Sequence, residues 1–332
     1  MLIAPIFTII GKVFAAKSGI LPVFWGVLGS LFLLAYWIRR KNFHLKYKDR
    51  QSLNFMIIYI KLSIKKELNM TLREKYGQWG IILGATEGVG KAFAEKIASE
   101  GMSVVLVGRR EEKLNDLGAS IKEKYGVDYK VIRADFADSS CTEKIFKETE
   151  DLDMGFMSYV ACFHAFGKLQ DTPWEKHEAM INVNVLTFLK CFYHYMQIFA
   201  RQDRGAVINV SSLTAISSSP YNAQYGAGKA YIKKLTEAVA GECEKTNVDV
   251  EVITLGTTIT PSLLNNLPGG SAGEAVMKAA MTPEAVVEEA FENLGKSLSV
   301  IAGEHNKANV HNWKANKTDD EYIRYMGSFY ER

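Results

Sequence analysis

The chain has 332 residues, of which 48% are hydrophobic and 23% are charged, a balance that fits a packed globular protein and excludes a disordered or collagen-like chain. Its four cysteines lie far apart, with no CxxC pair and no Cys/His spacing typical of zinc, so we expect neither a disulfide framework nor a metal site. The net charge of +3 divides into +9 over residues 1–69 and −6 over the rest, which argues against nucleic acid as the main partner.

The leader, residues 1–69, is predicted to be a membrane anchor. Between Lys17 and Arg39 lie 21 uncharged residues. As a helix they would span roughly 30 Å, the thickness of the hydrocarbon core. Trp37 at the end of this run, followed by positive charge, predicts a transmembrane helix at residues 18–38 that leaves the bulk of the chain in the cytosol. The alternative is a misassigned start, because Met70 opens a segment typical of the beginning of a soluble domain; the protein would then be cytoplasmic.

From residue 77 to residue 303, short apolar runs alternate with longer segments of helical period. The predicted strands are residues 79–83, 104–107, 129–132, 157–162, 206–210, 248–255 and 298–302, and the predicted helices are 91–98, 111–125, 174–200 and 223–246. This alternation implies right-handed βαβ crossovers and an α/β fold with a Rossmann-like, doubly wound parallel sheet. We therefore predict a single domain over residues 70–303 and a polar surface tail over residues 304–332. The small residues of the 223–246 helix favour a homo-oligomer.

The first predicted strand runs into a glycine-rich turn that carries Gly84, Gly88 and Gly90. Glycines allow a tight turn and close approach to a pyrophosphate, whose charge then lies at the N-terminus of the following helix. The strand before and the helix after are the context that a dinucleotide site requires. The next strand ends at Arg109 and Arg110, and arginine suits a 2′-phosphate where an acid would suit a ribose hydroxyl. The cofactor is accordingly predicted to be NADP(H).

Further along the chain lies a Tyr-x3-Lys pair, Tyr225 and Lys229. With fifteen tyrosines in the chain, about one such pair arises by chance, so the spacing alone carries little weight. Its position is more informative, because one helical turn places both side chains on the same face. Ser212 closes a predicted strand at the edge where parallel sheets bind ligands.

With these motifs in this order, the chain resembles the classical short-chain dehydrogenase/reductase family over about residues 77–303. The resemblance implies four catalytic residues: Asn184, Ser212, Tyr225 and Lys229. It implies cofactor contacts from Gly84, Thr86, Gly88, Val89, Gly90, Arg109, Arg110, Asp135, Phe136, Ala161, Tyr225, Lys229, Gly256, Thr258 and Thr260. The implied reaction interconverts a carbonyl and a secondary alcohol by hydride transfer.

Each implied catalytic residue has a chemical role in that reaction. Tyr225 would be the proton donor or acceptor, with its pKa lowered by the positive charge of Lys229 together with that of the nicotinamide ring. Ser212 would hold the carbonyl oxygen, and Asn184 would position a water molecule.

The chain departs from the family pattern in three places. Leu83 stands where a threonine usually precedes the first glycine, and Leu255 replaces the proline before Gly256. The segment 160–164 lacks the asparagines that usually follow the fourth strand, so it is open how that strand is braced. The leader resembles that of the membrane-anchored steroid and 3-oxoacyl-CoA reductases of this family.

The substrate is predicted to be a small apolar carbonyl or alcohol. Residues 261–281 combine leucine and methionine with a glycine-rich centre, which predicts a mobile lid over an apolar pocket. This composition does not separate a steroid from a fatty acyl or another ketone. His164 either reaches this pocket or is structural. The alternative functions are a cofactor-binding scaffold, which the intact Ser212, Tyr225 and Lys229 disfavour, and a nucleotide-sugar epimerase or dehydratase, for which too little chain follows Tyr225.

Overall fold

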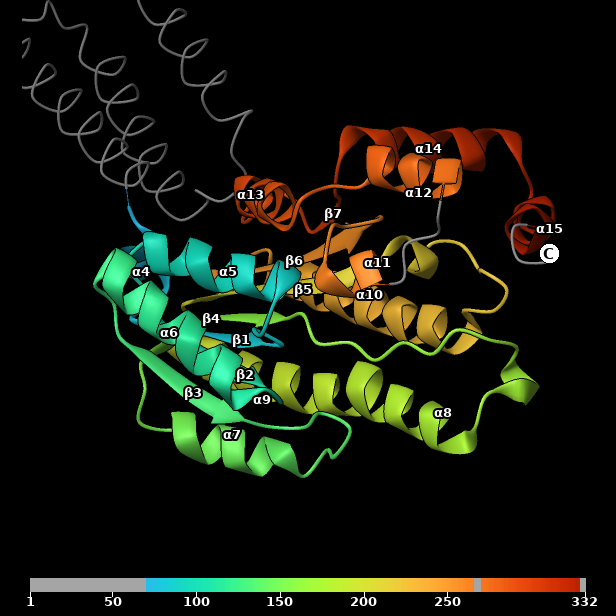
Figure 1. The fold of residues 1–332 in the computed structure, drawn as a ribbon. Coiled ribbons are helices and arrows are strands. Elements are labelled where there is room, and N and C mark those ends of the chain that lie inside the picture. The colour runs from blue at the N-terminus through green and yellow to red at the C-terminus, as the bar shows by residue number, and fades with distance from the viewer. Residues whose placement is uncertain (1–69, 266–269, 329–332) are drawn as a thin grey trace, which may run out of the picture. The chain divides into compact units, whose positions relative to one another are not determined.

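The computed structural model describes residues 70–265 and 270–328 (Figure 1). The leader, with its predicted transmembrane helix at residues 18–38, lies outside the described residues, as does the centre of the predicted lid at residues 266–269. Among the helices of the described ranges, none has the length and apolar character needed to cross a membrane.

The fold is built on one parallel sheet. Its strands are β1 Trp79–Leu83, β2 Ser103–Gly108, β3 Tyr129–Arg133, β4 Met154–Tyr159, β5 Gly205–Ser212, β6 Val248–Leu255 and β7 Ser299–Ile301. They are arranged in the order β3-β2-β1-β4-β5-β6-β7, and every neighbouring pair is parallel. After β3 the chain therefore crosses to the other side of β1, which creates a switch point between β1 and β4, the place where such sheets bind ligands. The prediction of a Rossmann-like, doubly wound sheet is confirmed.

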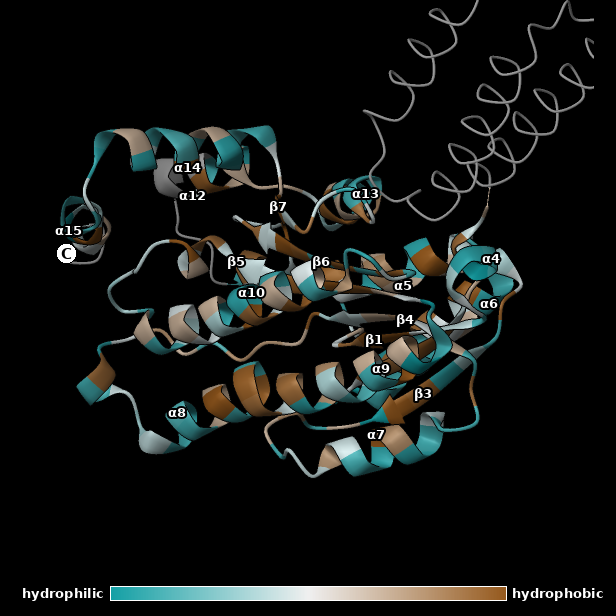
Figure 2. Ribbon diagram, turned by 180° about the vertical axis from the view of Figure 1, so that it is seen from behind, coloured by the Kyte–Doolittle hydropathy of each residue, from teal (hydrophilic) through white to brown (hydrophobic). Residues whose placement is uncertain are grey.

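Helices cover both faces of the sheet. They are α4 Leu72–Tyr76, α5 Gly88–Ser99, α6 Glu111–Tyr125, α7 Cys141–Thr149, α8 Trp174–Ile181, α9 Phe188–Gln202, α10 Ala223–Cys243, α11 Pro261–Asn265, α12 Gly270–Ala279, α13 Pro283–Asn293, α14 Glu304–Asn316 and α15 Asp319–Ser328, with a π-helical turn η2 Asn182–Thr187 and 3₁₀ turns η1 Leu169–Asp171 and η3 Leu213–Ala215. Successive strand side chains point to opposite faces. Ile82 thus faces the core under α5, α6 and α13, whereas Ile81 faces the core under α7, α9 and α10. Figure 2 shows that hydrophobic residues run along the strands, whereas α6 carries many strongly hydrophilic residues.

The strand and helix boundaries differ from the predicted ones in two places that bear on the site. The fourth strand is Met154–Tyr159, three residues earlier than predicted. Its ladder with β1 ends at Tyr159, because the next two N–H groups both donate to the Leu83 carbonyl, at 2.9 and 2.8 Å. The predicted helix 174–200 is interrupted by η2, a π-turn of the kind often found at functional sites.

The C-terminal residues 304–328 form the helices α14 and α15, where the sequence predicts a polar surface tail. Part of this segment is packed against the domain. Asn306 of α14 is buried and lies against Gly256, where an added Cβ would come within 2.5 Å of its Oδ1. Gly327 of α15 lies against Pro220. These helices therefore support the loops that follow β5 and β6.

Candidate active site

The glycine-rich turn between β1 and α5 forms a cradle that has no room for side chains. Gly84 has φ +101°, and a Cβ on it would lie 2.6 Å from the backbone nitrogen of Ala161. A Cβ on Gly90 would lie 1.9 Å from the Gly84 carbonyl oxygen, and Gly88, at φ +57°, lies against the Thr260 side chain. The turn leads directly into α5, and its N-cap residue makes no side-chain hydrogen bond to the helix. Bare backbone at a helix N-terminus suits a pyrophosphate, so these residues fit a dinucleotide.

The end of β2 meets this turn. A Cβ on Gly108 would lie 2.7 Å from the hydroxyl of Thr86, so the two segments are in contact. Arg109 is exposed. Arg110 forms an ion pair with Glu87 at 2.9 Å, and Lys113 lies 3.5 Å from the same carboxylate. The hydrogen bond from Arg110 is the largest cause that lowers the pKa of Glu87. Glu87 and Lys113 were not among the predicted site residues, although both lie within three residues of the predicted arginines or glycines.

Two of the predicted cofactor residues are core residues. Val89 and Phe136 are each 6% exposed, and the Phe136 ring lies 5.9 Å from that of Tyr159. Only their backbone is left for a cofactor. Asp135, in contrast, is exposed and accepts a hydrogen bond from the N–H of Ala137 at 3.1 Å.

Lys229 is held from two sides in the interior. It is 2% exposed, and its Nζ donates to the Val210 carbonyl at 3.0 Å. Its own carbonyl accepts from Ser211 Oγ at 2.8 Å, which gives Ser211 a structural role. The ammonium lies 5.9 Å from the ring centroid of Tyr225. Burial lowers the pKa of Lys229.

Ser212 and Tyr225 form the centre of the site. Ser212 Oγ accepts hydrogen bonds from Thr214, at 3.0 Å from its hydroxyl and 3.3 Å from its backbone N–H. Burial, and secondly the neighbouring Cys162, raise the pKa of Tyr225, whereas a hydrogen bond with Ser212 acts to lower it. A lowering of this pKa by Lys229 is not found in the chain alone, because burial outweighs the other contributions.

Asn184 explains how the chain after β4 is braced. It is fully buried in η2; its Oδ1 accepts from the N–H of Phe163 at 3.0 Å, and its Nδ2 donates to the Phe163 carbonyl at 2.8 Å. A Cβ on Gly228 of α10 would lie 2.9 Å from the Asn184 Cβ. This paired hydrogen bond holds the segment that lacks the family asparagines and ties it to the helix that carries Tyr225 and Lys229.

His164 lies beside Tyr225, the predicted proton donor. Its ring centroid is 4.7 Å from that of Tyr225, and its Nε2 is 2.6 Å from Oδ1 of Asn222. Nearby, the Phe166 ring stacks on Tyr221 at 5.8 Å. From the sequence, His164 could either reach the substrate pocket or be structural, and Asn222 was not among the predicted site residues, because no sequence motif marks it.

The segment after β6 carries the predicted contacts to the nicotinamide end. Thr258 bridges to Met281, and the N–H of Ile259 donates to the Met281 carbonyl at 2.8 Å. Thr260 lies against Gly88, as described above, which brings this segment to the glycine-rich turn. Leu263 and Met277 are partly buried.

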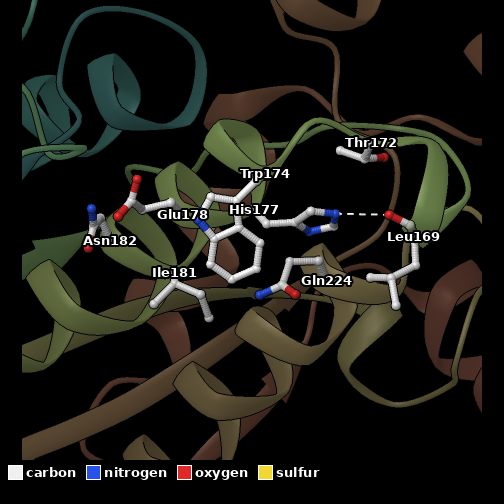
Figure 3. A pocket seen from close by; sticks show the side chains of 8 residues that line it. All are labelled: Leu169, Thr172, Trp174, His177, Glu178, Ile181, Asn182 and Gln224. Carbon is white, nitrogen blue, oxygen red and sulfur yellow. Dashed lines mark hydrogen bonds between the residues drawn. The ribbon is translucent and has the colours of Figure 1, made fainter.

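A cavity of about 680 Å³ lies next to this site (Figure 3). It is lined by Leu169, Thr172, Trp174, His177, Glu178, Ile181, Asn182 and Gln224. Figure 3 shows the hydrogen bond from His177 Nε2 to the Leu169 carbonyl, 3.1 Å long, across one side. Gln224 precedes Tyr225, but none of the four predicted catalytic residues lines this cavity. No cluster of three potential metal ligands occurs in residues 70–265 and 270–328.

Comparisons with known proteins agree with this geometry. The family model for short chain dehydrogenases matches residues 78–267. A 7beta-hydroxysteroid dehydrogenase of Mediterraneibacter gnavus is 76% identical over 262 residues, which are 79% of this chain and 100% of that protein. A solved structure from work on 7beta-hydroxysteroid dehydrogenase stereoselectivity is 76% identical, with a TM-score of 0.76, and covers 78% of this chain and 100% of its own. A short-chain dehydrogenase of Sphingobium yanoikuyae in complex with NADPH shares the fold at a TM-score of 0.63 and 22% identity, over 72% of this chain and 92% of its own.

Proposed function

The chain belongs to the short-chain dehydrogenase family and is an oxidoreductase of secondary alcohols and carbonyls; from this premise we propose that it is an NADP(H)-dependent hydroxysteroid dehydrogenase acting at a 7β-hydroxyl group. The observation that carries the proposal is the 76% identity over the full length of a 7beta-hydroxysteroid dehydrogenase. The assembled Ser212, Tyr225 and Lys229 support it and disfavour a scaffold without activity.

The residues of the glycine-rich turn fit a nicotinamide dinucleotide. The bare backbone around Gly84 and Gly90 would hold the pyrophosphate at the N-terminus of α5. Arg109 and Arg110, with no acid at the end of β2, favour the 2′-phosphate of NADP(H). When bound, the nicotinamide supplies or accepts the hydride.

Tyr225 would hold and move the proton. Its raised pKa keeps the phenol protonated near neutral pH, which is the form that donates a proton to a carbonyl oxygen. The oxidative direction needs the phenolate, so its rate should increase with pH. Ser212 accepts its hydrogen bonds from Thr214, which leaves its own hydroxyl hydrogen for Tyr225 or the substrate oxygen.

Asn184 and Lys229 would position these groups. The Asn184 side chain spends one N–H and one oxygen lone pair on Phe163, so any water that it orders would be held by its second N–H, its second lone pair or its backbone carbonyl. The buried ammonium of Lys229 is fixed by Val210 close to the tyrosine ring. In that position it would bind the nicotinamide ribose and favour the phenolate.

The surroundings of Tyr225 favour a rigid apolar substrate. His164 lies against its ring, and Phe166 and Tyr221 stack beyond it. Leu263 and Met277 of the predicted lid are partly buried and would add aliphatic surface to the substrate pocket. Aromatic and aliphatic surfaces of this kind suit the fused rings of a steroid.

The test uses the purified full chain with NADP⁺ and a pair of steroids that differ only in the configuration of the 7-hydroxyl. We expect nicotinamide reduction with the 7β epimer, little with the 7α epimer, and none with Tyr225→Phe. Equal rates with both epimers, or turnover of 3-oxoacyl thioesters but of no steroid, would contradict the proposal.

A further inference from the structure

Glu87 places a negative charge among the cations at the end of β2. Its carboxylate lies 2.9 Å from Arg110 and 3.5 Å from Lys113. The two segments also meet beside this ion pair, since a Cβ on Gly108 would lie 2.7 Å from the side-chain hydroxyl of Thr86. The acid of the glycine-rich turn therefore faces the cations of the β2–α6 turn directly.

The Glu87 side chain is directed away from its own helix. Glu87 is the N-cap residue of α5, with φ −164° and ψ 173°, and it makes no side-chain hydrogen bond to the helix. An N-cap side chain often accepts from the free N–H groups of the first turn. Here the carboxylate bonds to Arg110 instead, which leaves those N–H groups for an anionic ligand.

The charges in this cluster determine how Glu87 affects the binding of a phosphate. Arg109, Arg110 and Lys113 contribute three positive charges, and Glu87 removes one of them. A 2′-phosphate brings between about −1.5 and −2 charges near neutral pH. It would compete with the carboxylate for the same donors, and the two anions would repel each other at short range. A 2′-hydroxyl carries no such charge and can donate its hydrogen to the carboxylate.

We propose that Glu87 determines cofactor selectivity by competing with the 2′-phosphate of NADP(H) for Arg110 and Lys113, so that the affinity for NADP(H) is lower than the three cations alone would give. This inference rests on the proposed use of NADP(H). Arg109, whose side chain has no hydrogen bond or ion pair to other residues of the described ranges, is the cation that stays available to the phosphate. Glu87 thus reduces the difference in affinity between NADP(H) and NAD(H).

The experiment compares 2′,5′-ADP with 5′-ADP by calorimetric titration of the full chain. Glu87→Gln keeps the size of the side chain and an oxygen that accepts from Arg110, and it removes only the charge. We expect it to bind 2′,5′-ADP roughly five- to twentyfold more tightly, with 5′-ADP unchanged or weaker. This gain should shrink as salt is added, because the groups are partly exposed.

Two controls separate charge from structure. Glu87→Asp keeps the charge and should bind 2′,5′-ADP nearly as the parent does. Glu123→Gln removes an exposed acid at the far end of α6 and should change neither titration.

The possible outcomes are distinct. Unchanged or weaker binding of 2′,5′-ADP by Glu87→Gln overturns the proposal. Parallel weakening of both ligands also overturns it, because Glu87 would then only fasten the two turns together. A parent chain that binds both ligands equally refutes the preference for NADP(H), while the ratio of variant to parent still decides the role of Glu87.

Discussion

The two sides of the site are built in different ways. On the pyrophosphate side, β1, the glycine-rich turn and α5 follow one another in the chain, and the important property is the absence of side chains at Gly84, Gly88 and Gly90. On the catalytic side, side chains from β5, α10, η2 and the segment after β4 meet only in the folded protein. A substitution on the pyrophosphate side should thus impair cofactor binding, and a substitution on the catalytic side should impair the chemical step.

Tyr225→Phe should have the largest effect and confine it to the catalytic side. The variant loses the hydroxyl that we propose as the proton donor but keeps the ring that packs on His164. We expect kcat to fall by about three orders of magnitude or more, with cofactor affinity and folding intact. Steady-state kinetics and a cofactor titration check this. A rate near that of the parent would place the acid elsewhere.

Lys229→Met should affect both sides of the site, the chemical step and cofactor binding. Its ammonium is proposed both to favour the tyrosinate and to bind the nicotinamide ribose, so kcat should fall by about two orders of magnitude and cofactor affinity by about tenfold. The rising limb of the pH–rate profile for oxidation should move to higher pH. An unmoved profile together with unchanged cofactor affinity would show that Lys229 only fills the interior.

Gly90→Ala should affect the pyrophosphate side alone. The added Cβ would meet the Gly84 carbonyl oxygen at 1.9 Å, so the turn must open. We expect the cofactor KM to rise by at least about tenfold while kcat at saturation stays close to that of the parent. Gly241→Ala is the control, because a Cβ there meets nothing within 4 Å. A larger loss in kcat than in KM would contradict the division of the site into two sides.

Glu251→Gln should change stability and leave both sides of the site as they are. Glu251 lies fully buried in β6, and neither of its carboxyl oxygens has a hydrogen-bond partner within the described part of the chain. Burial, and secondly Glu289 and Asp249, raise its pKa to about 9 from an ordinary 4.5. The folded state therefore binds this proton more tightly, and the stability that the proton contributes is lost as the pH rises from about 4.5 through 9.

The variant has no such proton to lose. Glu251→Gln should be more stable than the parent by about 4 to 5 kcal/mol at pH 8, and the difference should vanish towards pH 4.5. Urea unfolding at several pH values measures it. A constant difference across this range would mean that Glu251 does not hold its proton in the folded state.

The features that the sequence by itself determined are those set by near neighbours. The strand–turn–helix around Gly84 to Gly90 and the Tyr225–Lys229 spacing each lie within one or two turns of chain, so backbone geometry alone makes them recognisable. The strands at 79–83 and 248–255 and the helix at 111–125 were likewise predictable, because the hydrophobic period marks both their type and their ends.

Only the tertiary structure decided the contacts between distant segments. The Asn184–Phe163 pair spans 21 residues of chain and the His164–Asn222 bond spans 58. The residues next to each partner in the sequence do not indicate which distant residue it will contact. The same holds for Asn306 against Gly256, which makes part of the C-terminal segment a support of the nicotinamide-end loop. The pKa of Tyr225 is also decided here, because burial is a property of the packed molecule, whereas the nearby lysine was all that the sequence could show.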